Sequence, residues 1–93
     1  MLTRAALLDA IEYRHRRALA LCLCERRHLA RLTQKELANL ACVSPSEIQH
    51  IERIRRNPGS GTLKRVTWAL GIFQTELIAQ VERVESQWAI EGL

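Results

Sequence analysis

Two helix-start signals stand eleven residues apart in the middle of the chain, and they restrict the fold more than any other feature. Thr33-Gln34-Lys35-Glu36 and Ser44-Pro45-Ser46-Glu47 both have the form of a capping box, in which a hydroxyl accepts from a helix amide and a glutamate reaches back to the cap. Proline at the first helical position of the second segment costs no hydrogen bond. Only residues 41–43 separate the first helix from the second cap. The spacing predicts two short helices joined by a tight turn, as in a helix-turn-helix.

Apolar residues at helical spacing extend the pattern on both sides of this pair. Residues 3–30 contain no glycine or proline and favour a helix, but the basic run 14–17 allows either one long helix or two shorter ones. The apolar stripe of this segment is Leu8, Ile11, Ala18, Cys22 and Leu29. The apolar positions of the two central helices are Leu37, Ala38, Leu40 and Ala41, followed by Ile48, Ile51 and Ile54.

A loop and two further helices follow. Residues 57–61 predict the loop, Ser60 or Thr62 is expected to cap the next helix, and Gly71 is expected to end that helix in a left-handed conformation. Its inward positions are Leu63, Val66, Ala69 and Leu70, and the last helix, from Phe73 to about Trp88, has the stripe Leu77, Val81, Val84 and Trp88. We therefore expect one all-α domain over residues 1–93, a compact bundle of five or more helices that contains a helix-turn-helix. Its core would span about 19–77, with helical extensions at 1–18 and 78–93.

Charge is distributed unevenly along the chain. Residues 1–65 carry thirteen basic and six acidic side chains, whereas residues 66–93 carry one basic and four acidic side chains. A basic body of this kind suits a polyanion such as nucleic acid. A solvated surface rich in arginine would give the same distribution.

The patterns typical of catalytic and metal sites do not occur. The three histidines are scattered, and Gly59 and Gly61 lack the strand and lysine of a phosphate-binding loop. Cys22 and Cys24 would point to different faces of a helix, which is poor geometry for a shared metal. We expect no enzyme activity, no metal and no cofactor. The uncharged run 18–24 is too short to cross a bilayer and no signal-peptide core precedes it, so a cytoplasmic, nucleoid-associated protein is expected.

The segments 32–38, 43–52, 55–58, 62–63 and 69–72, in this order and spacing, resemble the lambda-repressor-like helix-turn-helix family of Cro and phage-repressor type. The resemblance implies that the helix beginning at Pro45 is a recognition helix whose N-terminal half enters the major groove. Three positions depart from the family pattern. Cys42 and Ile54 stand where glycine is frequent, so a positive φ is expected at Cys42, and Arg26 stands where the family often has an aliphatic residue.

The resemblance and the side-chain chemistry together indicate a DNA-binding surface. Gln34 begins the first motif helix, where the helix dipole and free amides favour a phosphate. Hydroxyl, amide and imidazole groups on the recognition helix can bind base edges, whereas Glu47 is expected to complete its capping box and Glu52 to form an internal salt bridge. The residues expected at DNA are Gln34, Lys35, Ser44, Pro45, Ser46, Gln49, His50, Arg53, Arg55, Arg56 and Asn57.

These features predict a sequence-specific DNA-binding transcriptional regulator, a repressor, that binds an inverted-repeat operator as a homodimer. The dimer or partner interface is expected at Trp68, Leu77, Val81, Val84 and Trp88, although both tryptophans could instead be core covered by the N-terminal extension. One alternative is an antitoxin whose extensions bind a toxin and whose DNA binding serves autoregulation. Another is a module that binds only proteins.

Overall fold

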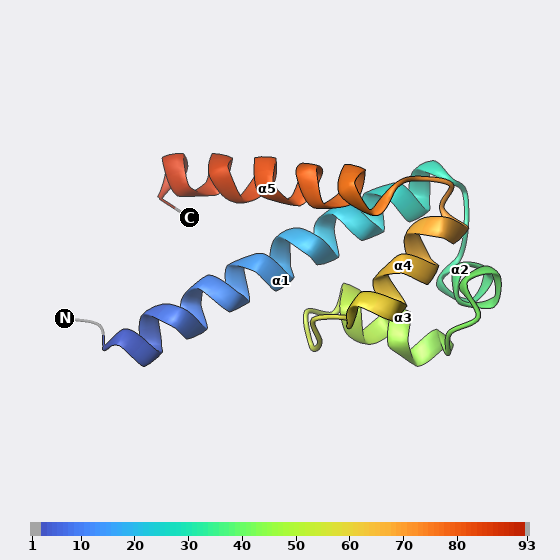
Figure 1. Cartoon of the computed structure of the whole chain (residues 1–93), viewed down its shortest axis with the longest axis horizontal. Coiled ribbons are helices and arrows are strands. Elements are labelled where there is room, and N and C mark those ends of the chain that lie inside the picture. Colours follow the sequence, from blue (N-terminus) through green and yellow to red (C-terminus); the bar gives the residue numbers. More distant parts are fainter. Residues whose placement is uncertain (1–2, 93) are drawn as a thin grey trace.

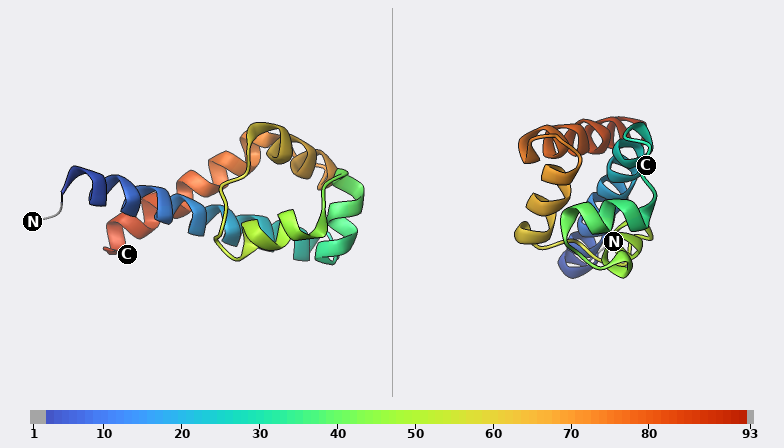
Figure 2. Two further views of the ribbon diagram at one scale, coloured as in Figure 1. Left: turned by 90° about the horizontal axis from the view of Figure 1, so that it is seen from below. Right: turned by 90° about the vertical axis from the view of Figure 1, so that its right-hand side faces the viewer.

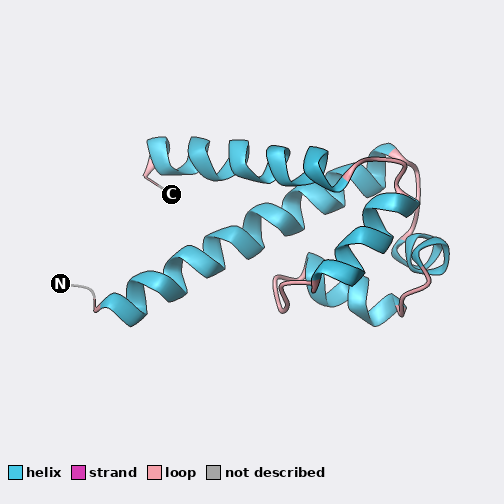
Figure 3. Ribbon diagram, in the orientation of Figure 1, coloured by secondary structure: helices cyan, strands magenta, loops and turns pink. Residues whose placement is uncertain are grey.

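The computed structural model describes residues 3–92, and all the regular secondary structure in this range is helical (Figures 1 and 3). The helices are α1 (Arg4–Leu29), α2 (Gln34–Ala41), α3 (Pro45–Glu52), α4 (Ser60–Ala69) and α5 (Gln74–Glu91). The expected all-α class and the helix-turn-helix are thereby confirmed. Residues 1, 2 and 93 of the expected domain lie outside the described range.

The N-terminal segment forms one helix of 26 residues, which decides between the two alternatives left open by its basic run. Thr3 caps this helix, since its Oγ1 accepts a hydrogen bond from the amide of Ala6 at 3.1 Å. The helix continues through the basic run because two of its side chains find partners on α5. His15 Nδ1 lies 3.0 Å from a carboxylate oxygen of Glu85, and the guanidinium of Arg17 lies over the ring of Trp88, 4.8 Å from its centroid.

Two clusters of buried residues hold the molecule together. The first cluster joins α1 to α2, α3 and α4 and contains Leu23, Leu37, Ala38, Ala41, Ile48, Ile51 and Val66. The second joins α1, α4 and α5 and contains Ala18, Leu19, Cys22, Leu63, Leu77 and Val81. Figures 1 and 2 show the result: α2, α3 and α4 gather beside the C-terminal half of α1, while α1 and α5 extend away from them and give the molecule its longest dimension of 45 Å.

Three helix ends take a left-handed conformation without using glycine. Arg31 follows α1 with a φ of 58°, Cys42 ends α2 with a φ of 56°, and Ile54 follows α3 with a φ of 64°. The positive φ expected at Cys42 is therefore confirmed. Gly71 ends α4 with a φ of 71°, as its place in the sequence predicted.

The start of α4 and the second capping box differ from the expectation. Gly59 precedes α4 without a side-chain hydrogen bond, so the predicted cap by Ser60 or Thr62 is wrong. Thr62 Oγ1 instead donates to Glu47 Oε2 at 3.4 Å. The carboxylate of Glu47 is thus directed to α4, and only Ser44 contributes to its cap, accepting from the amide of Glu47 at 3.3 Å.

Several apolar residues expected in the core are exposed, and two residues expected at an interface are core. Leu8, Ile11, Leu29 and Leu40 each expose about half of their surface or more. Leu77 and Val81 are fully buried in the second cluster. The prediction that these two residues bind a partner is corrected, because they are already covered by α1.

Candidate nucleic-acid interface

The turn between α2 and α3 is fixed by hydrogen bonds at both ends. The amide of Glu36 donates to Thr33 Oγ1, and the amide of Thr33 donates to Glu36 Oε1, each at 3.0 Å, so the first capping box is complete. The amide of Thr33 holds the pKa of Glu36 below its ordinary value, which keeps this cap charged. At the other end, Arg65 Nη1 of α4 donates to the carbonyl of Cys42 at 3.1 Å. This hydrogen bond from α4 therefore helps to fix the backbone of the turn that precedes α3.

A buried ion pair ties the end of α3 to α1. Arg27 Nε donates to Glu52 Oε2 at 2.8 Å and Arg27 Nη2 donates to Glu52 Oε1 at 2.9 Å, while Nη1 donates to the carbonyl of Leu32 at 2.9 Å. The two side chains are 10% and 7% exposed. Burial alone would raise the pKa of Glu52, but hydrogen bonds from Arg27 and Gln34 outweigh it and lower that pKa. The internal salt bridge expected for Glu52 is present, and its partner is Arg27.

The outward face of α3 carries the side chains that were expected to read bases. Ile48 and Ile51 are buried, and Ser46, Gln49 and His50 lie on the other side of the helix at spacings of three and four residues. Pro45 and Ser46 are exposed and Gln49 and His50 are half-buried. The Oγ of Ser46 lies 3.0 Å from that of Ser44, so one hydroxyl can orient the other. This face can present hydrogen-bonding groups to a groove.

The segment after α3 places three basic side chains beside that face. Arg53, Arg55, Arg56 and Asn57 are all exposed. The backbone of this segment is held by hydrogen bonds to α3, from the amide of Arg53 to the carbonyl of Gln49 at 2.9 Å and from the amide of Arg55 to the carbonyl of His50 at 2.8 Å. A fixed backbone with exposed guanidinium groups is suited to phosphate contacts.

The two residues of α2 that were predicted to contact DNA differ in their surroundings: one is exposed, and the other already donates a hydrogen bond within the protein. Lys35 is exposed. Gln34 is half-buried, and its Nε2 donates to Glu52 Oε1 at 3.1 Å. The structure therefore brings the N-terminus of α2 next to the end of α3.

The sequence did not identify Arg27 or Arg65, which hold the end of α3 and the turn before it through hydrogen bonds. Arg27 did carry a signal, because it follows Leu19 and Leu23 at intervals of four residues and so lies on the buried face of α1. A charge at such a position requires a partner. Arg65 had no comparable signal, since its bond goes to a backbone carbonyl 23 residues away.

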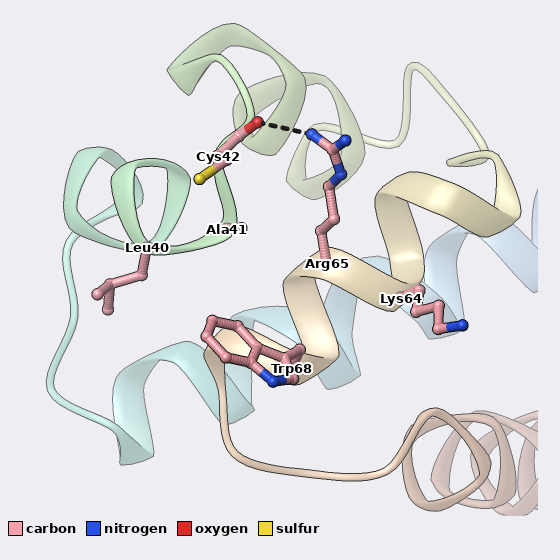
Figure 4. Close-up of a pocket in the computed structure, with 6 residues that line it drawn as sticks. All are labelled: Leu40, Ala41, Cys42, Lys64, Arg65 and Trp68. Atoms are coloured by element: carbon pink, nitrogen blue, oxygen red, sulfur yellow. Dashed lines mark hydrogen bonds between the residues drawn. The ribbon is translucent and has the colours of Figure 1, made fainter.

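A separate apolar surface surrounds Trp68, one of the residues expected at an interface. Trp68 is 77% exposed, and it lines a shallow pocket with Leu40, Ala41, Cys42, Lys64 and Arg65 (Figure 4). Phe73, 75% exposed, lines an adjoining pocket that also includes Trp68. Val84 and Trp88 are half-buried at the edge of the second cluster.

No group of three or more histidine, cysteine, aspartate or glutamate side chains within residues 3–92 is placed to hold a metal ion. Burial raises the pKa of the Cys22 thiol to about 11, so this thiol stays protonated at neutral pH. None of the described helices is both long and apolar enough to span a bilayer.

The arrangement of α2, α3 and the basic segment defines a helix-turn-helix protein of the DNA-binding class. The family model described as "Helix-turn-helix domain" matches residues 18–81. The chain belongs to this helix-turn-helix family, of Cro-like type, and is a DNA-binding transcriptional regulator.

The solved structures that are similar to this chain include two crystal structures of one regulator. One is a crystal structure of the clp gene regulator ClgR from Corynebacterium glutamicum, with a TM-score of 0.77 and 28% identity over 84% of this chain and 83% of that chain. Another crystal structure of ClgR from the same organism has a TM-score of 0.69 and 30% identity over 75% of this chain and 91% of that chain. No curated protein sequence matches the chain.

Proposed function

We propose that this chain is a sequence-specific repressor that binds an inverted-repeat operator as a homodimer. The observation that carries the proposal is the exposed face of α3, where Ser46, Gln49 and His50 are directed away from the buried Ile48 and Ile51. Hydroxyl, amide and imidazole groups are the kinds of group that distinguish base pairs in the major groove. The similarity to a clp gene regulator supports the regulatory part of the proposal.

Binding would consist of non-covalent contacts to the DNA, with no bond formed or broken. The exposed guanidinium groups of Arg53, Arg55 and Arg56 hold phosphates, together with Lys35 and the N-terminus of α2. Pro45 at the start of α3 supplies an apolar contact for a thymine methyl group. Repression follows where the bound dimer overlaps the site at which polymerase starts. DNA as the ligand also agrees with a cytoplasmic, nucleoid-associated location.

Selection from random double-stranded DNA with the full chain tests this proposal. We expect enrichment of an inverted repeat whose half-sites lie one helical turn apart, roughly 34 Å from centre to centre. Recovery of sequences no different from the starting pool would contradict sequence-specific binding. Enrichment of a single half-site would support α3 as the recognition helix but contradict binding as a homodimer.

A second candidate function rests on the apolar surface around Trp68. An antitoxin needs a surface for its toxin in addition to a DNA-binding surface. The exposed side chains of Trp68, Phe73 and Leu40 line two pockets that include no residue of α3. Co-expression with the product of an adjacent gene, followed by co-purification of wild type and a Trp68→Ala variant, tests this candidate. A complex formed by wild type and lost in the variant favours the antitoxin.

A further inference from the structure

The N-terminal half of α1 carries an apolar face that the other described residues, within 3–92, do not cover. The C-terminal half of α1 uses the same face against α5, through the buried Ala18 and Cys22 and the contact of His15 with Glu85. Ile11 and Leu8 continue this face one and two turns further toward the N-terminus. They are nevertheless 51% and 52% exposed. Figure 1 shows the cause, since the axes of α1 and α5 diverge toward the N-terminus of α1.

This uncovered part of α1 lacks the tertiary packing that stabilises most helices in proteins. Residues 4–14 form about three turns at the end of a 26-residue helix, where fraying is easiest. Leu7 and Tyr13 add to its apolar surface, each 49% exposed. A contact with another molecule would stabilise the helix and remove this surface from water.

The charges on α1 and α5 favour a second copy of the chain as that molecule. Residues 4–17 of α1 carry four arginines and two acidic side chains, whereas residues 82–91 of α5 carry three glutamates and one arginine. A two-fold axis that brings α1 of one protomer against α5 of the other would pair a basic segment with an acidic segment twice. An interface of this kind is self-complementary, as closed dimers require.

A buried donor points in the same direction. Arg16 Nε is buried and has no hydrogen-bond partner among the described residues. Arg16 lines a hollow between α1 and α5 together with Ile11, Glu85 and Asn57. A small shift of the Arg16 side chain toward this hollow would let the donor meet an acceptor from a second copy. Asn57 belongs to the segment that follows the recognition helix, so the hollow also lies next to the proposed DNA-binding surface.

We propose that residues 4–14 of α1 and the C-terminal part of α5 form the dimer interface with the same segments of a second copy, as a four-helix bundle on the two-fold axis. The proposal rests on the homodimer of the proposed function and gives it an interface that Leu77 and Val81 cannot supply. It also gives the N-terminal extension of α1 a role in setting the distance between the two recognition helices.

The test is sedimentation of the full chain without DNA, comparing wild type with a Leu8→Asp, Ile11→Asp double variant. We expect wild type to be a dimer and the variant to be a monomer whose dimer dissociation constant rises by at least about a hundredfold. Circular dichroism should show that most of the helix content is kept, because both residues are half exposed in the protomer. Trp68→Asp is the control, since it places the same charge on an exposed apolar surface of α4 outside the proposed interface segments, and it should remain dimeric.

A double variant that stays dimeric, a monomeric wild type, or a dimer broken by Trp68→Asp and not by the α1 changes would each overturn the interface. If Asp substitution melts α1, the Leu8→Gln, Ile11→Gln variant replaces it, because glutamine is a good helix former and carries no charge. The DNA binding of the same proteins distinguishes failure of the interface from failure of the proposed function. A monomeric variant that still prefers the half-site would support α3 as the recognition helix. A dimeric wild type that binds no preferred sequence would support the interface but contradict the proposed function.

Discussion

Arg27 and Glu52 form a two-bond ion pair that fastens the end of the recognition helix to α1, with N–O distances of 2.8 and 2.9 Å. The same carboxylate accepts from Gln34 at the start of α2. Three elements that are separate in the sequence thus meet at one carboxylate. The orientation of the proposed reading face depends on this pair, since α3 has only eight residues with which to pack.

Replacement of Arg27 by methionine should destabilise the fold. The change leaves the carboxylate of Glu52 buried without its cation, which typically costs about 3–5 kcal/mol of unfolding free energy. Urea unfolding followed by circular dichroism measures the loss. Arg26→Met is the matched control, because Arg26 is a half-buried neighbour whose Nε donates only to the amide oxygen of Gln80. Equal losses in the two variants would show that the ion pair adds nothing specific.

The same variant has a distinct dependence on pH. In wild type the pKa of Glu52 lies below its ordinary value of 4.5, so the contribution of the pair is present above that pH and is lost as pH falls through the lowered pKa. In Arg27→Met, protonation of Glu52 relieves the unpaired charge. Burial raises the pKa of Glu52 when Arg27 is absent, so the difference in unfolding free energy between wild type and variant should shrink as pH falls through that raised pKa, and shrink further below about pH 4.5, where the wild-type pair loses its contribution. A difference that grows in acid would contradict this assignment.

The left-handed conformation of Cys42 predicts a stabilising substitution. Cys42→Gly should raise the unfolding free energy by up to about 1 kcal/mol, because a residue with a Cβ is strained at a φ of 56° and glycine is not. The exposed thiol makes little contribution that could be lost. Cys42→Ala removes the thiol but keeps the Cβ, so it should give no such gain. Thermal unfolding of both variants separates the two effects, and a loss of stability in Cys42→Gly would exclude strain as the controlling factor.

Burial of Val81 predicts that a charge at this position unfolds the chain, whereas the sequence placed Val81 at a dimer or partner interface. Val81→Asp places a charge at a fully buried position between α5 and α1, and it should abolish cooperative unfolding or lower its midpoint strongly. Ala79→Asp lies on the same helix at an exposed position outside the proposed interface segment 82–91, and it should leave stability nearly unchanged. Circular dichroism and sedimentation together make the comparison. A folded, monomeric Val81→Asp protein would show that Val81 contacts a second subunit and is not part of the core of the protomer.

The exposed arginines after α3 should govern the salt dependence of DNA binding. Arg55→Ala with Arg56→Ala should weaken binding to operator and random DNA alike, and each lost phosphate contact should reduce the slope of log K against log salt by about one unit. Lys64→Ala, at an exposed position of α4 outside the basic segment and the proposed dimer interface, is the control for a simple change of net charge. A slope that falls by the same amount per removed charge in Lys64→Ala would show that only total charge matters.

Local signals in the sequence predicted the helix-turn-helix well, because caps are made by residues three positions apart. Thr33 and Ser44 mark the starts of α2 and α3 in the structure as they did in the sequence. Gly71 and Cys42 likewise ended their helices as expected, since a left-handed residue is a local requirement.

Contacts between distant segments could not be predicted in this way. The basic run on α1 looked like a possible break, and only its partners Glu85 and Trp88 on α5 show why the helix continues. Glu47 had the right position for a cap, but Thr62 offered it another partner. The C-terminal stripe was read as an interface because nothing local shows which helix covers it.

We propose that α3 reads the DNA sequence through its outward face. Parallel selections with wild type, Ser46→Ala and His50→Ala test this role most directly. Each variant should lose discrimination at one or two positions of the half-site, by roughly 1–3 kcal/mol per lost base contact, with little change in binding to random DNA. If both variants select the wild-type operator with unchanged preference at every position, α3 is not the element that reads DNA.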